Sequence, residues 1–378
     1  MNSAFWISNL TLTNFRSYDH LKLEFDPSPV VITGPNGSGK TNILEAVSLL
    51  ASGRGLRMAR LSEIDKRQKS DSPYNVFGWA INAAVNLGEN QTVISTARET
   101  SRDNIDKRII KIDGEIKRNS SALESAFSLI YFVPQMNHIF TEGRRTRLAF
   151  LDRLTMLFDY GHPKRLGVYE KYSAERRRLL KENPDEIWLS ATESTMAEQA
   201  VAIAASRLEA LEYIGKALAE FDSRFPRARM EVKGLVEDNF PKMPALQLEE
   251  FFKAKLEEAR KLDFFSGRTN YGVHRSDFSV VYAENGALAE NCSTGEQKAL
   301  LLSIILGAAR AKATWFNAAP VVLLDEIVAH LDDERREELF GQIASLGIQA
   351  WMTATHPKFF KNFAGKMQFF SVHDSVIC

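Results

Sequence analysis

The residues with the clearest chemistry lie in the segment 31–42, VITGPNGSGKTN. It contains the pattern G-x-x-x-x-G-K-[ST] between a strand-like run and an apolar, helix-like run. Glycines let backbone N–H groups approach phosphates, the lysine reaches the β- and γ-phosphates, and the threonine hydroxyl binds Mg²⁺. A chance match on a glycine turn is the alternative, but the flanking pattern favours a nucleoside triphosphate site. The candidate nucleotide-binding residues of this loop are Gly34, Pro35, Asn36, Gly37, Ser38, Gly39, Lys40, Thr41 and Asn42.

A second candidate element is the aliphatic run VVLLDE at 321–326. A buried strand would deliver Asp325 to Mg²⁺, and Glu326 would polarise the attacking water as catalytic base. Gln135, just after the apolar run 129–133, could contact the same Mg²⁺ and water. Acidic pairs also end strands without any function, and loop glutamines are often only solvated. The sequence therefore predicts catalytic residues Glu326, Asp325, Lys40 and Gln135, with Thr41, Gln135 and Asp325 on Mg²⁺.

The segment STGEQ at 293–297 is a second phosphate-binding element, because it precedes a long apolar helix over 299–313. One phosphate loop already serves the ATP within the subunit. We therefore expect Ser293 and Gly295 to cap the γ-phosphate of ATP bound to another copy of the chain. Asp332 would communicate across such a dimer, and His356 is a candidate γ-phosphate sensor.

Two basic segments could bind anions. Arg16 could reach back toward the nucleotide or be a solvated loop residue, and the loop that carries Arg54, Arg57 and Arg60 is either an anion-binding loop or a connection. Residues 144–181 hold eleven Lys or Arg against four Asp or Glu, which indicates either a binding surface or a solvated helix face.

The elements that must position these residues follow from hydrophobic periodicity. Residues 5–25 predict two strands, 74–118 predict antiparallel hairpins, and 129–137 and 270–282 each contain a strand. A helix from Lys40 should end near 51–53. A long helix over 143–182 and a second over 188–221 should form an antiparallel arm, followed by a helix at 246–262.

Composition limits the class of protein. The 378 residues allow two domains or one domain with a large insertion. The 48 Lys and Arg balance the 48 Asp and Glu, so any nucleic-acid surface must be local. The two cysteines, Cys292 and Cys378, provide no disulfide framework and favour a reducing cytoplasm. The sequence has no run of 18 apolar residues, so we expect no membrane span.

The order of phosphate loop, glutamine loop, STGEQ, acidic pair and Leu331-Asp332 resembles an ABC-type ATPase head of the SMC and Rad50 class. More narrowly, NFRSY at 14–18, GRRTRLAFLDRL at 143–154, GVHRSD at 272–277 and STGEQKALLLSIILGAAR at 293–310 are similar to the RecF family of recombination-mediator ATPases. That resemblance implies an α/β fold: an ABC-type ATPase head, with a P-loop α/β core and an antiparallel β subdomain, and an inserted helical lobe.

The resemblance also implies how the site works. It implies ATP and Mg²⁺ as cofactors, slow ATP hydrolysis, and a signature of Ser293, Gly295, Glu296 and Gln297 contributed in trans. It implies an ATP-dependent homodimer that binds DNA at single-strand gaps or junctions, with RecO and RecR as partners. The division would be 1–142 and 266–378 for the head and 143–265 for the lobe. The candidate DNA-binding residues are Arg57, Arg144, Arg145, Arg147, Arg176, Arg177 and Arg178.

Other classes of P-loop protein fit less well. A transporter subunit would need a surface for membrane helices and would not need the helical arm. An ATPase-controlled nuclease would need a carboxylate cluster after the ATPase, where this chain has 52 residues after Glu326. An SMC- or Rad50-like tethering protein, the main alternative, would need long coiled-coil arms.

Overall fold

The structure, a computed structural model, describes residues 3–66, 78–100, 106–182, 185–220, 223–326, 328 and 331–377. These residues form two compact units. The head unit comprises 1–136, 223–225 and 305–378, and the helical unit comprises 137–222 and 226–304. Parts of some predicted elements lie outside the described residues, namely Val76, Phe77, Asn183, Pro184, Phe221 and Cys378.

The strands are β1 Phe5–Phe15, β2 Tyr18–Glu24, β3 Val30–Thr33, β4 Ala80–Leu87, β5 Asn90–Thr100, β6 Asp106–Ile112, β7 Glu115–Lys117, β8 Leu129–Phe132, β9 Ala228–Lys233, β10 Asp277–Tyr282, β11 Val321–Leu324, β12 Ala350–Ala354, β13 Gln368–His373 and β14 Val376–Ile377. The helices are α1 Lys40–Ser48, α2 Ala122–Ala126, α3 Arg144–Thr155, α4 His162–Lys181, α5 Glu186–Glu220, α6 Ala245–Glu258, α7 Arg260–Ser266, α8 Thr294–Phe316 and α9 Asp333–Leu346. Short 3₁₀ helices include η2 Pro134–His138, η4 Val273–Arg275 and η7 Pro357–Lys366.

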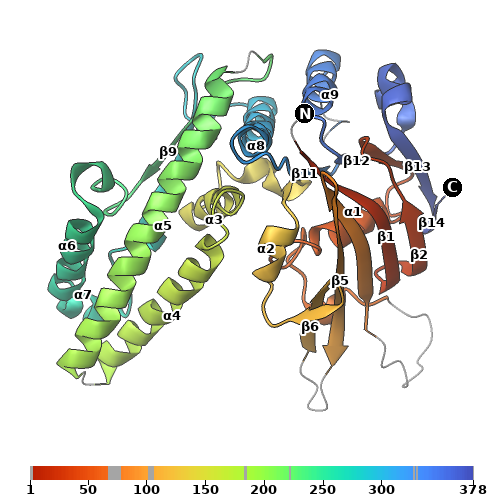
Figure 1. Cartoon of the computed structure of the whole chain (residues 1–378). Coiled ribbons are helices and arrows are strands. Elements are labelled where there is room, and N and C mark those ends of the chain that lie inside the picture. Colours follow the sequence, from red (N-terminus) through yellow and green to blue (C-terminus); the bar gives the residue numbers. More distant parts are fainter. Residues whose placement is uncertain are drawn as a thin grey trace. The chain divides into compact units, whose positions relative to one another are not determined.

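One sheet of the head unit positions the predicted catalytic residues. Its strand order is β14-β13-β3-β12-β11-β8, and β13, β3, β12, β11 and β8 pair in parallel. Figure 1 labels four of these strands, β11, β12, β13 and β14. The aliphatic residues of β3 and β11 are fully buried, as expected for strands covered on both faces. Because parallel strands end at the same edge, the residues that follow β3, β11, β12 and β8 are brought together.

A second, antiparallel sheet in the head unit has the order β2-β1-β4-β5-β6-β7. The predicted hairpin turns are confirmed. Gly88 between β4 and β5 has φ 60°, and Asp113 and Gly114 between β6 and β7 have φ 50° and 84°. Two successive residues with positive φ match the right-handed twist of the paired strands, which is why an Asp-Gly pair occurs there.

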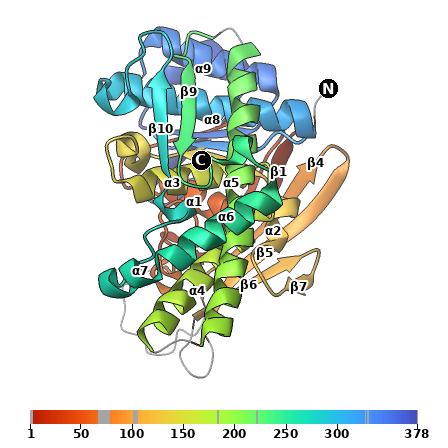
Figure 2. The ribbon, with the colours of Figure 1, turned by 90° about the vertical axis from the view of Figure 1, so that its left-hand side faces the viewer.

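The helical unit is built on the long helix α5, which packs against α4 and α6 (Figure 2). Its core includes Met196, Ala200, Phe252 and Tyr169. The prediction of one continuous helix over 143–182 is wrong, because α3 ends at Thr155 and α4 begins at His162. Asp159 accepts a hydrogen bond from the Gly161 N–H at 2.8 Å and Pro163 lies in the first turn of α4, so the chain turns between the two helices.

Residues 266–304 cluster with the helical unit, whereas the family resemblance implies a place in the head. Strand β10 pairs antiparallel with β9, from Asp277 opposite Lys233 to Tyr282 opposite Ala228. This pairing joins segments far apart in sequence, which periodicity alone does not reveal. Helix α1 also ends at Ser48, a few residues before the predicted end near Gly53.

Helix α8 is the one described helix that is long and apolar enough to cross a membrane, by length and composition. Within the protein, 78% of its most apolar window is buried. That burial is typical of a core helix.

Candidate nucleotide site

The phosphate loop joins the buried strand β3 to α1, and its glycines are required by space. A Cβ at Gly34 (φ 149°) would lie 2.1 Å from the Val372 carbonyl oxygen. A Cβ at Gly39 (φ 112°) would lie 2.7 Å from the Tyr18 hydroxyl oxygen. Any side chain at Gly34 or Gly39 would therefore displace Val372 or Tyr18. Because both positions are glycine, no side chain covers the backbone N–H groups of the loop there.

Two polar groups of the loop lie ready for a ligand. Lys40 is buried, and its Nζ donates to the carbonyl oxygens of Gly34 and Pro35, both at 2.8 Å. Burial lowers the pKa of Lys40, while the nearby Glu326 and Asp325 carboxylates act to raise it. The buried Ser38 Oγ has no hydrogen-bond partner among the described residues. A phosphate oxygen would supply a missing partner, so the loop fits a nucleotide phosphate.

The acidic pair lies beside this loop, in the same unit. The Asp325 Oδ1 accepts from the Thr41 hydroxyl at 3.1 Å and from the Thr353 hydroxyl at 2.6 Å. The Glu326 backbone N–H donates to the Thr353 hydroxyl oxygen at 2.9 Å. Glu326 has φ 55°, a left-handed conformation uncommon for residues other than glycine and often found at functional sites.

Sequence reasoning did not single out Thr353, although it bonds to both residues of the acidic pair. The available signal was a threonine in the otherwise apolar strand β12. Gln135 lies in η2, just past β8, whose Phe132 carbonyl oxygen accepts from the Asp325 N–H at 3.0 Å. The sheet thus brings the Gln135 segment next to the acidic pair, and its contact with Mg²⁺ stays a prediction.

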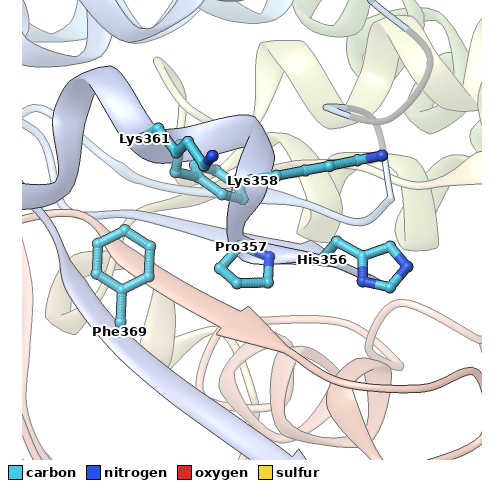
Figure 3. A pocket seen from close by; sticks show the side chains of 6 residues that line it. His356, Pro357, Lys358, Lys361 and Phe369 are labelled. Atoms are coloured by element: carbon cyan, nitrogen blue, oxygen red, sulfur yellow. The ribbon is translucent and has the colours of Figure 1, made fainter.

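A cavity of about 750 Å³ opens beside the loop. Residues 33–36, His356 and His373 are among its lining residues, so β13 contributes to the site, which the sequence did not indicate. His356 also lines a neighbouring pocket of about 590 Å³, in which it and Phe369 lie on either side of Pro357 (Figure 3). A role of His356 in sensing the γ-phosphate stays a prediction.

Two residues of the site, Thr41 and Asp325, could hold Mg²⁺. The described residues contain no group of three or more His, Cys, Asp and Glu side chains arranged for a metal. Mg²⁺ bound with a nucleotide needs only one or two protein ligands besides phosphate and water oxygens. The Thr41 hydroxyl and the Asp325 carboxylate, 3.1 Å apart, fit that requirement.

Arg16 and Arg57 bind within the chain to the same buried carboxylate. Arg16 donates to both Glu45 oxygens, at 2.8 and 2.6 Å, and Arg57 donates to Glu45 at 2.8 Å. Arg57 also donates to the Asn42 side-chain oxygen at 2.8 Å. Glu45 therefore ties both arginines to α1. Their predicted contacts with nucleotide and DNA, and that of Asn42, stay predictions.

The STGEQ segment lies in the helical unit, at the start of α8. The Ser293 backbone and hydroxyl donate to Glu296 at 2.8 and 2.7 Å, which caps the helix. Gln297 donates to the Cys292 carbonyl oxygen at 3.0 Å. Gly295 is exposed, and a Cβ there would meet nothing within 4 Å. Nothing in the described part of its own chain requires a glycine at that position.

Asp332 has a local role in the structure. It is the N-cap of α9 and accepts from the Arg335 backbone N–H at 2.8 Å. Its side chain is exposed. Communication across a dimer stays a prediction for this residue.

The basic candidates for DNA binding divide into two groups. Arg176 is completely buried against Glu193 and Asp263, so its prediction as a DNA-binding residue is wrong. Arg147 pairs with Asp277 at 2.7 Å, and Arg178 pairs with Glu175 and Glu182, both at 2.7 Å. The ion pairs of the described residues do not include Arg144, Arg145 or Arg177. A helical repeat of arginines alone does not separate these groups.

Comparison with known proteins places this arrangement in a family. A family model described as the RecF/RecN/SMC N terminal domain matches residues 6–377. The DNA replication and repair protein RecF of Rickettsia akari is 38% identical over 364 residues, which are 96% of this chain and 98% of that protein. The chain belongs to the RecF family. The corresponding RecF of Rhizobium rhizogenes is 40% identical over 370 residues, 97% of this chain and 96% of that protein.

Solved structures support the same fold. The recombination mediator protein RecF-ATP in the RecFOR pathway has a TM-score of 0.84 and 24% identity, over 100% of this chain and 99% of that one. An Smc head domain from Pyrococcus furiosus has a TM-score of 0.56 and 16% identity, over 99% and 95%. The predicted ABC-type head fold is confirmed. As a RecF-family protein, the chain is an ATPase of the ABC and SMC class.

Proposed function

We propose that this RecF-family chain is an ATP-dependent DNA-binding protein of DNA replication and repair. In this proposal ATP closes a homodimer on DNA, and slow hydrolysis reopens it. The observation that carries the proposal is the meeting of two motifs 284 positions apart, since the Thr41 hydroxyl donates to Asp325 at 3.1 Å beside a loop whose Ser38 hydroxyl is unpartnered. The curated relatives named above are DNA replication and repair proteins.

The chemistry assigns a distinct task to each residue of the site. The loop N–H groups and Lys40 would bind the β- and γ-phosphates, and Thr41 and Asp325 would hold Mg²⁺, which polarises the phosphates when bound. Glu326 would accept a proton from the attacking water, as general base. Its left-handed backbone conformation and the bond of its N–H to Thr353 would orient the carboxylate.

The STGEQ segment supports a site shared between two copies of the chain. Ser293 and Gly295 are exposed at the N-terminus of α8, where backbone N–H groups favour an anion. The open space around Gly295 suggests that the glycine serves the close approach of something outside its own chain. We infer that these residues, with Gln297, contact the γ-phosphate of ATP bound to a second copy.

The partner proteins and the DNA structure are proposed from the descriptions of similar proteins. The solved neighbours are described as a recombination mediator in the RecFOR pathway, so we propose RecO and RecR as partners in the cytoplasm and gaps or junctions as the DNA. An SMC- or Rad50-like tethering role is less well supported, because α4 and α5 have only 20 and 35 residues.

Sedimentation of the purified protein tests the proposal. Glu326→Gln would block hydrolysis and hold the ATP state, and Lys40→Ala is the matched variant that should not bind ATP. We expect Glu326→Gln to convert from monomer to dimer with ATP and Mg²⁺, and the dimer to sediment with a short duplex carrying a single-stranded extension. A protein that hydrolyses ATP briskly but remains monomeric would contradict the proposal.

A further inference from the structure

Three arginines of the helical unit differ from their neighbours because no carboxylate neutralises them. Arg144 starts α3, Arg177 lies on α4 and Arg275 ends η4. In the described part of the chain, none of the three forms an ion pair with Asp or Glu, while Arg147, Arg176 and Arg178 all do. Arg144 is exposed, and Arg177 and Arg275 are half-buried.

Backbone and hydroxyl oxygens hold these arginines in place. Arg144 donates to the Arg275 carbonyl oxygen at 2.9 Å, and Arg275 donates from Nε to the Thr269 carbonyl oxygen at 3.1 Å. Arg177 donates to the Ser173 hydroxyl at 3.1 Å. These acceptors are neutral, so they orient the guanidinium groups and leave the positive charge in place.

His274 lies at the centre of this arrangement. Its Nε2 is 3.0 Å from the Thr269 carbonyl oxygen and therefore donates; in the neutral imidazole its Nδ1 then accepts from the Tyr169 hydroxyl at 2.9 Å. His274 is exposed, yet desolvation of its ring and the guanidinium groups of Arg275, Arg177 and Arg144 lower its pKa, while the bond to Thr269 raises it. A neutral imidazole thus fixes the segment without adding charge.

The backbone of the segment is built around the same contacts. Gly272 has φ 138°, and a Cβ there would lie 1.9 Å from the Tyr169 hydroxyl oxygen. Only glycine permits the bond between Tyr169 and His274. The first turn of α3 also carries Arg144 and Arg145 but no acidic residue, the reverse of what the helix dipole favours. Positive charge is therefore concentrated at the start of α3, although it lowers the stability of that helix end.

We propose that Arg144, Arg177 and Arg275, arranged around His274, form a binding site for a backbone phosphate of DNA. This inference rests on the proposed DNA-binding function and locates one of its contacts. Guanidinium groups match phosphate oxygens in geometry and charge, and an unneutralised cluster attracts a polyanion. Phosphate contacts carry no base information, so the site would hold DNA of any sequence.

Fluorescence anisotropy over a series of salt concentrations tests the site. The probe is a labelled duplex with a single-stranded extension, in two unrelated sequences, with ATP, Mg²⁺ and the full-length protein. We expect Arg144→Ala and Arg177→Ala each to weaken binding equally for both sequences and to reduce the salt slope by about 1. Lys216→Ala, at an exposed lysine of α5 that pairs with Glu212, removes one positive charge outside the cluster; it is the matched control and should bind as wild type does.

Arg275 needs a conservative variant because it also supports Thr269 and Arg144. Arg275→Lys keeps the charge and should retain most of the salt slope, whereas Arg144→Glu should weaken binding more than Arg144→Ala. ATP binding and thermal melting report whether each variant is folded. If wild type binds DNA and the Arg144 and Arg177 variants keep its slope, the phosphate site is wrong. If wild type binds no DNA in any nucleotide state, the proposed function itself fails.

Discussion

The nucleotide site of the head unit and the buried core of the helical unit use charged residues in opposite ways. In the nucleotide site of the head unit, Lys40, Asp325 and Glu326 lie within one loop cluster, and Ser38 has no partner among the described residues. In the helical unit, buried Arg176 and Arg207 are each matched by two carboxylates. The first arrangement leaves bonding capacity for a ligand, while the second uses it within the chain. The comparison teaches that the lack of an internal partner, more than charge itself, marks a functional residue.

Glu326→Gln should give the largest effect, and it should be an effect on chemistry. We expect the rate of ATP hydrolysis to fall about 10²-fold or more, because the general base is lost. ATP binding and the melting temperature should stay near those of wild type. Steady-state hydrolysis and nucleotide binding measured on one preparation check this. A variant that still hydrolyses ATP at the wild-type rate would remove Glu326 from the mechanism.

Arg176→Ala should have a large effect on stability. The variant leaves Glu193 and Asp263 buried without this partner, and we expect a loss of roughly 3–5 kcal/mol in the free energy of unfolding. Arg178→Ala, at the exposed end of the same helix, should show no measurable change. Urea denaturation of both variants tests the contrast. Equal stability of the two would mean that the buried network contributes little.

Lys312 on α8 tests whether every buried charge of the head unit serves the nucleotide site. It is 1% exposed, and burial lowers its pKa to about 8. The folded state disfavours the charged form, so Lys312→Met should raise the free energy of unfolding at pH 7 and leave hydrolysis unchanged.

The pH dependence of stability, compared between wild type and Lys312→Met, tests the direction of the pKa shift of Lys312. Between pH 8 and about 10.5, the unfolded wild type binds more protons at this position than the folded protein does. The stability of wild type relative to Lys312→Met should therefore rise with pH over that window. A difference between the two proteins that stays constant with pH would show that the lysine is not perturbed.

Asp332→Ala should give the smallest effect on the isolated chain. Loss of the cap on α9 should cost about 1 kcal/mol in unfolding free energy, while Asp332→Asn keeps a capping oxygen and should cost less. If Asp332 also acts across a dimer through its charge, both variants should weaken ATP-dependent dimerisation. Thermal melting and sedimentation separate the two roles.

The nucleotide site could be predicted from sequence because its motifs are local. The loop at 34–41 and the pair Asp325-Glu326 each combine fixed residue types with a flanking strand. Thr353 was not predicted, since a single threonine in an apolar strand gains its role only from the neighbouring strand in the sheet.

The helical unit was harder to predict because its contacts, like that of Thr353, join residues far apart in the sequence. Its periodicity gave the helices, but the break at Gly161 depends on a side-chain bond from Asp159. The burial of Arg176 depends on α5 and α7, and the position of residues 266–304 depends on the pairing of β10 with β9. Long-range pairing decides which arginines are neutralised, so charge counting along one helix does not find the DNA surface.

The central claim is that one ATP site is built from two copies of the chain. Mixing two inactive variants tests it most directly. Lys40→Ala has no working phosphate loop, and Ser293→Arg has no working signature. A mixed dimer would still contain one intact site, formed by the loop of the second variant and the signature of the first. The account predicts that mixing restores part of the ATP hydrolysis that each variant lacks alone, and a mixture as inactive as its components would contradict it.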